Sequence, residues 1–62
     1  MEMYIIGDRN PPFWCRRRIM PYMKRNGETG YEFHGRQGIL MLEKGDRLMR
    51  GHNKDIFVRK KG

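Results

Sequence analysis

The chain is almost free of cysteine: Cys15 is the one thiol among 62 residues. A single cysteine cannot form an internal disulfide, and a lone thiol is typical of a reducing, intracellular setting. The other candidate zinc ligands, His34 and His52, are too few and too scattered for a structural metal site. Stability must therefore come from apolar side chains, from a partner or from a second copy of the chain.

Long apolar runs and targeting features are also lacking. No run approaches the roughly 18 apolar residues of a membrane helix. The first residues, MEMYIIGD, have neither the basic start nor the long apolar stretch of a signal peptide. We therefore expect no membrane partner and a cytoplasmic location.

Acidic residues are scarce, with 7 Asp and Glu against 14 Lys and Arg, and the net charge is +7. Such a charge attracts phosphate backbones and acidic protein surfaces, so the expected partner is an acidic protein or DNA or RNA. Arginine suits bidentate phosphate contact, but arginine stems also cover apolar surface on a solvated face. The candidate partner-binding residues are Arg16, Arg17, Arg18, Lys24, Arg25, Lys60 and Lys61.

The apolar residues that are present amount to 37% of the chain and include seven aromatic side chains, enough for one small core. We expect one domain over residues 1–62. The expected class is α+β: a small β-rich domain with an N-terminal strand at 3–6, a short helical segment, and then a four-stranded antiparallel meander that forms a curled sheet or a small barrel.

The four strands of the meander are expected at residues 31–34, 39–42, 47–50 and 56–59. GRQG suits a hairpin connection, and Gly45 in EKGD is free to take positive φ. In the last strand, Ile56 and Val58 face the core while Phe57 faces the other side. The final residues, 60–62, are expected to be a frayed end.

The helical segment contains an obstacle, Pro21. Pro12 is suited to the first helical position, and Cys15, Ile19, Tyr22 and Met23 would share one helix face. A proline in a helix interior costs about 3 kcal/mol. Two alternatives follow: Pro21 kinks one helix, or a helix over 12–19 ends and a separate turn begins at Pro21.

Several side chains have a structural and a chemical interpretation. Phe13 and Trp14 could stack on bases, but a small domain needs such aromatics as core anchors. Cys15 could be a nucleophile activated by neighbouring arginines, but its position favours a buried core residue. No phosphate-cradling motif is present. We therefore expect a protein that is not an enzyme and that uses no cofactor or metal.

Three short segments between residues 31 and 57 carry a resemblance to a known family. YEF is followed by GILMLEKGDRLMRG and then NKDIF, and PPFW precedes them. This order resembles a family of small bacteriophage and prophage proteins with the pattern PGD-(Y/W)-(I/L)-(I/V)-x-G followed by KPDIF. Lys44 replaces the usual proline, and the hairpin normally found before DIF is nearly absent. The resemblance implies a β-rich phage accessory protein that acts in the host cell.

A weaker resemblance is to small messenger-RNA-cleaving toxins with a double-stranded-RNA-binding-like fold. Their catalytic histidine lies in a G-S-H-H turn, of which only Gly51-His52 is present. A ribonuclease that uses His52 is a distant alternative. His34 and His52 are both expected to be surface histidines, because neither has an acidic or thiol partner at an informative spacing. The thin core and exposed strand edges also make a homodimer an expectation.

Overall fold

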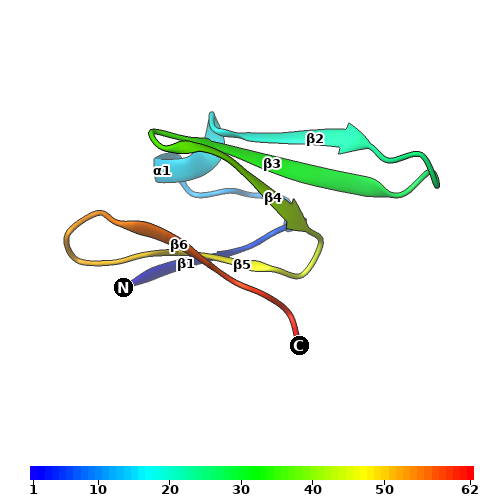
Figure 1. Cartoon of the computed structure of the whole chain (residues 1–62). Coiled ribbons are helices and arrows are strands. Elements are labelled where there is room, and N and C mark those ends of the chain that lie inside the picture. Colours follow the sequence, from blue (N-terminus) through cyan, green and yellow to red (C-terminus); the bar gives the residue numbers. More distant parts are fainter.

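The computed structural model describes residues 1–62 and shows two three-stranded antiparallel sheets and one short helix (Figure 1). No helix has the length and apolar character needed to cross a membrane. The elements are β1 (Glu2–Ile5), α1 (Phe13–Arg16), β2 (Ile19–Met23), β3 (Thr29–Gly35), β4 (Gly38–Glu43), β5 (Arg47–Arg50) and β6 (Ile56–Arg59). The small β-rich class is confirmed, and strands occur at the five expected places with bounds that differ by up to two residues. β2 is a sixth strand, where a helical segment was expected.

The strands pair in the orders β2-β3-β4 and β1-β5-β6, and the two sheets lie over one another as layers (Figure 1). The four-stranded meander and the closed barrel were wrong, because β4 does not pair with β5. The chain crosses between the layers at Gly45 and Asp46. There Gly45 donates its N–H to the Ile6 carbonyl and Ile6 donates to the Asp46 carbonyl. These bonds tie the crossing to the end of β1, so β5 pairs with β1 instead.

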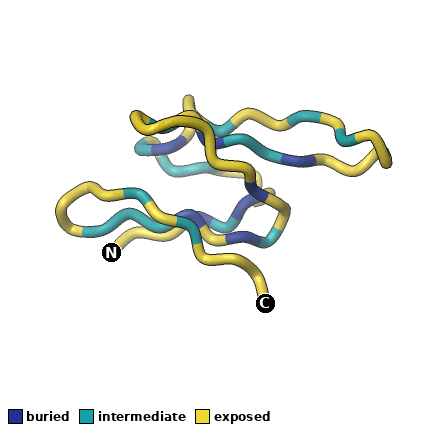
Figure 2. The backbone as a smooth tube through the Cα atoms, in the orientation of Figure 1, coloured by how far each residue is buried: buried dark blue, intermediate teal, exposed yellow.

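The core lies where the two layers face each other (Figure 2). Six apolar side chains are buried there, and partly buried ones such as Ile56 and Val58 pack against them. Phe57 points to the other side and is 44% exposed, as expected for alternation along a strand. The buried set is Tyr4, Ile6, Cys15, Phe33, Leu42 and Leu48.

Pro21 neither kinks a helix nor starts a turn, and both alternatives were wrong. The helix has four residues, with Arg17 as its C-cap, and β2 already begins at Ile19. Pro21 lies within β2 opposite Tyr31, on an outer strand of the sheet. Proline is tolerated on such an edge because its missing N–H faces away from the ladder. Ile19, Tyr22 and Met23 consequently do not share a helix face with Cys15.

Asp46 is the one buried charged side chain, with 1% of its surface exposed. Its Oδ2 accepts hydrogen bonds from the Glu43 backbone N–H at 2.9 Å and from Lys60 Nζ at 2.8 Å, and its Oδ1 accepts from the Lys61 N–H at 3.2 Å. Lys60 also donates to the Met41 carbonyl. The C-terminal residues Lys60 and Lys61 are therefore anchored, and the expected frayed end was wrong for them.

The pKa of Asp46 reflects two opposing causes. Burial raises the pKa, but the hydrogen bonds from Lys60 and from the backbone N–H groups of Glu43 and Lys61, together with the Lys60 charge, outweigh burial. The pKa therefore lies below its usual value. A depressed pKa means that the ionised carboxylate stabilises the folded state.

Substituting Asp46→Asn should destabilise the fold by about 2–3 kcal/mol, since it weakens a set of charge-assisted hydrogen bonds in a buried site. Urea unfolding followed by circular dichroism measures the change. Asp8→Asn is the matched control, because Asp8 is exposed and its carboxylate makes no hydrogen bond. We expect the control to change stability by less than about 0.5 kcal/mol. Equal effects of the two substitutions would contradict this role of Asp46.

The same carboxylate should contribute an acid-sensitive part of the stability. Its contribution is fully present above the unfolded pKa of about 3.9 and is lost as pH falls through the lower folded pKa. The difference in unfolding free energy between wild type and Asp46→Asn should therefore shrink between about pH 6 and about pH 2.5. A difference that stays constant over this range would show that the charge of Asp46 does not stabilise the fold.

Candidate functional site

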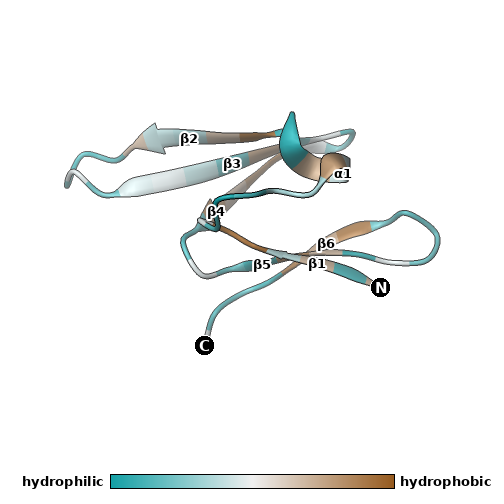
Figure 3. Cartoon of the chain, turned by 180° about the vertical axis from the view of Figure 1, so that it is seen from behind, coloured by the Kyte–Doolittle hydropathy of each residue, from teal (hydrophilic) through white to brown (hydrophobic).

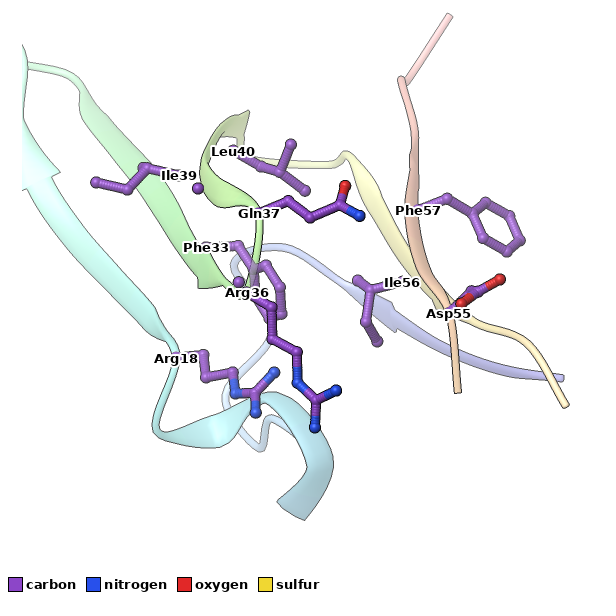
Figure 4. Close-up of a pocket in the computed structure, with 11 residues that line it drawn as sticks. Arg18, Phe33, Arg36, Gln37, Ile39, Leu40, Asp55, Ile56 and Phe57 are labelled. Carbon is purple, nitrogen blue, oxygen red and sulfur yellow. The ribbon is translucent and has the colours of Figure 1, made fainter. Parts of the chain in front are cut away.

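A groove with a volume of about 710 Å³ opens between the two sheets (Figure 4). Its long sides are β4 and β6, each the outer strand of its own sheet. Phe33 lies at its base and is almost fully buried, whereas Leu40 is 40% exposed. The groove therefore combines an apolar base with a solvent-accessible opening.

Two arginines, Arg18 and Arg36, line this groove, and Figure 4 shows their guanidinium groups directed to the same end of it. Arg18 comes directly before β2, where its carbonyl accepts the His34 N–H at 2.9 Å. Arg36 occupies the two-residue turn between β3 and β4, flanked by the paired Gly35 and Gly38. The tertiary structure thus brings together two cations that are 18 positions apart in the sequence.

Neither of these two arginines has a carboxylate partner. The four ion pairs of the structure are formed by Lys24, His34, Arg50 and Lys60. The acidic side chain that lines the groove, Asp55, accepts a hydrogen bond from Asn53 Nδ2 at 2.7 Å instead. Two free guanidinium groups at one end of an apolar groove form a suitable binding site for an anionic group attached to an apolar body.

Of the seven candidate partner-binding residues, only Arg18 lines this groove. Lys24 is paired with Glu43 at 3.2 Å, which raises the Lys24 pKa mainly through that hydrogen bond. Lys60 is paired with Asp46 at 2.8 Å. The set does not form one face, because its other six members lie at three further places: Arg16 and Arg17 at α1, Lys24 and Arg25 at the β2–β3 turn, and Lys60 and Lys61 after β6.

Arg36 is the groove residue that the sequence reasoning missed. It lies in the GRQG turn, which was expected as a hairpin connection and is confirmed as one by the pairing of Gly35 with Gly38. One sequence signal was available: Arg36 is the only Lys or Arg between Arg25 and Lys44. A single arginine in a turn gives no information on which other cation the fold places beside it.

The remaining candidates have definite environments. Trp14 packs against the core, but Phe13 is 85% exposed, so the expectation that both are core anchors was wrong for Phe13. His34 has a partner after all, since its Nε2 lies 3.1 Å from Glu32 Oε1. His52 is exposed and its ring makes no hydrogen bond. No group of three or more His, Cys, Asp or Glu side chains is placed to hold a metal ion.

Cys15 is fully buried, as expected for a core residue. Its Sγ lies 3.7 Å from the Pro12 carbonyl. Burial raises the pKa of the Cys15 thiol to about 11, and the opposing effect of the Arg16 charge is smaller. The thiol is therefore protonated at neutral pH, and a protonated, buried thiol is a poor nucleophile.

Comparison of the chain with protein-family models, with curated proteins and with solved structures found no match. The resemblances to phage proteins and to ribonuclease toxins consequently stay predictions. The features of this chain that bear on its function are therefore the groove and the charges around it.

Cys15 should react very slowly with a thiol reagent in the folded protein, because reaction requires both exposure and a thiolate. The measurement is the rate of colour release from an aromatic disulfide reagent at neutral pH, in buffer and in concentrated urea. We expect the folded protein to react at least about a hundredfold more slowly than the unfolded one. Comparable rates in the two solutions would contradict the burial and the raised pKa of Cys15.

Proposed function

We propose that this chain is a non-enzymatic binding protein that holds an acidic segment of another protein in the groove between its two sheets. The observation that carries the proposal is the pair of unpaired arginines, Arg18 and Arg36, at one end of an apolar groove. Carboxylates accept bidentate hydrogen bonds from arginine, and apolar neighbours on the same polypeptide would cover Leu40 and Phe57, which line the groove and are partly exposed.

The overall charge supports the same kind of partner. A net charge of +7 accelerates encounter with an acidic surface and disfavours basic ones. The other exposed arginines contribute to this long-range attraction without contacting the ligand. The resemblance to phage accessory proteins favours a host protein as the partner.

A second candidate function is sequence-independent binding of single-stranded nucleic acid. The observation that favours it is Phe13, which is 85% exposed and lies one helical turn from Arg16 and Arg17. An exposed aromatic ring stacks on a base at about 1–3 kcal/mol, and neighbouring arginines contact phosphates. This site lies at α1, so substitutions separate it from the groove.

The double substitution Arg18→Gln and Arg36→Gln should weaken binding of a random copolymer of glutamate and tyrosine by at least about tenfold, because it removes two charged hydrogen-bond donors from the groove. Fluorescence anisotropy of the labelled copolymer at low and at physiological salt measures the affinity. Arg9→Gln combined with Arg25→Gln is the matched control: it removes two exposed charges outside the groove. We expect it to change affinity by less than about twofold.

Three results would decide between the candidates. Equal affinities for the groove variant and for the control with Arg9→Gln and Arg25→Gln would refute the groove as the binding site. Tighter binding of a thymidine oligonucleotide than of the copolymer, weakened by Phe13→Ala and strongly by salt, would establish the nucleic-acid function instead. Failure of both probes to bind at low salt would reject both functions.

A further inference from the structure

The two outer strands of the β2-β3-β4 sheet differ in how their free edges are protected. Natural sheets block an exposed edge with proline or with charged side chains, because unpaired backbone groups recruit another strand. On β2 the edge carries Pro21. On β4, residues 38–42 read GILML and contain neither a proline nor a charge. The β4 edge therefore lacks the usual protection.

The register of β3 and β4 shows which backbone groups of β4 are free. Gly35 and Gly38 flank a two-residue turn and pair with each other, so they form a hydrogen-bonded pair, and such pairs alternate along an antiparallel ladder. Leu40 and Leu42 consequently bond to β3, while the N–H and C=O groups of Ile39 and Met41 point to the open edge. The Met41 carbonyl confirms this direction, because it accepts a hydrogen bond from Lys60 Nζ at 3.2 Å.

The open edge borders the arginine-lined groove. Ile39 and Leu40 line the groove from β4, and Arg36 lies in the turn where β4 begins (Figure 4). Figure 3 colours parts of both β4 and β6 toward the hydrophobic end of the scale. The side chains of Ile39 and Met41 are 54% and 53% exposed, so no other part of the chain covers them fully.

We infer that the acidic partner segment enters the groove as an extended strand that pairs with the free edge of β4 at Ile39 and Met41. This inference rests on the proposed function and specifies how the partner binds. Strand addition would satisfy the three free backbone groups, namely the Ile39 N–H, the Ile39 C=O and the Met41 N–H. Carboxylates at the end of the strand nearest the β3–β4 turn would reach Arg18 and Arg36.

A polypeptide fits these features better than the other occupants do. Backbone N–H and C=O groups alternate along a peptide at the spacing of the free groups on β4, whereas a nucleic acid offers no such ladder. A second copy of the chain would bring two charges of +7 together. The unpaired arginines of the groove favour a strand that carries negative charge.

The substitution Ile39→Pro tests the pairing directly. Proline removes the outward N–H of residue 39 but leaves the hydrogen bonds of Leu40 and Leu42 to β3 in place. The matched control is Ile39→Ala, which removes the side chain and keeps the N–H. The probe is a synthetic peptide of alternating Val and Thr with two Glu residues at its N-terminus or at its C-terminus, because the strand direction is an outcome of the test.

We expect Ile39→Pro to weaken peptide binding by about tenfold or more relative to Ile39→Ala, as the loss of one backbone hydrogen bond and a steric clash predict. Met41→Pro and Met41→Ala form a second pair with the same expected contrast. Two forms of the peptide, one N-methylated at its odd residues and one at its even residues, are then compared on the wild-type protein. One of the two forms should bind about tenfold more weakly than the other, because only one of them loses the N–H groups that face β4. This last measurement holds even if a proline variant fails to fold.

Equal binding of the proline and alanine variants, together with equal binding of both N-methylated peptides, would overturn strand addition. If the Arg18→Gln and Arg36→Gln variant still lost binding in that case, the groove function would stand and only its mode would fail. Stronger binding of a thymidine oligonucleotide than of the peptide would show that the ligand is a nucleic acid and not a peptide strand. A concentration-dependent dimer in sedimentation, abolished by Ile39→Pro, would identify a second copy as the strand and overturn the inference.

Discussion

The burial of the Asp46 carboxylate is the interaction on which the arrangement of the two sheets depends. Its three hydrogen-bond donors come from the end of β4 and from the residues after β6, so one side chain joins the turn between the layers to the C-terminus. A buried charge without partners would cost several kcal/mol. The fold must therefore bring Lys60 and Lys61, the residues that follow β6, back to this turn at the end of β4.

The edges of the β2-β3-β4 sheet differ in how far they are protected. Lys60 covers the Met41 carbonyl and thereby closes the end of the β4 edge next to Asp46. Pro21 protects the opposite edge of the same sheet. What stays open is the stretch of β4 next to the β3–β4 turn, where Arg18 and Arg36 lie without carboxylate partners. The free backbone groups of β4 and two unpaired cations thus lie at one site.

The net charge of +7 is a poor guide to which cations bind a partner. Two of the seven residues chosen by sequence density, Lys24 and Lys60, are engaged by Glu43 and Asp46. Arg16 donates from its Nε to the Pro11 carbonyl at 3.1 Å. A run of like charge identifies where cations lie along the chain, but a binding site depends on which of them lack an internal partner and face a groove.

Local patterns in the sequence determined the positions of every strand except β2, the β3–β4 hairpin, the positive φ of Gly45 and the burial of Cys15, because periodicity and turn chemistry act over a few residues. Only the tertiary structure decided that β5 pairs with β1, where Glu2 lies opposite Arg50. It also decided that Pro21 lies in an edge strand and that Arg18 and Arg36 line the same groove. Such outcomes depend on which distant segments bury each other's apolar faces, and a strand's alternation specifies its buried side but not its neighbour.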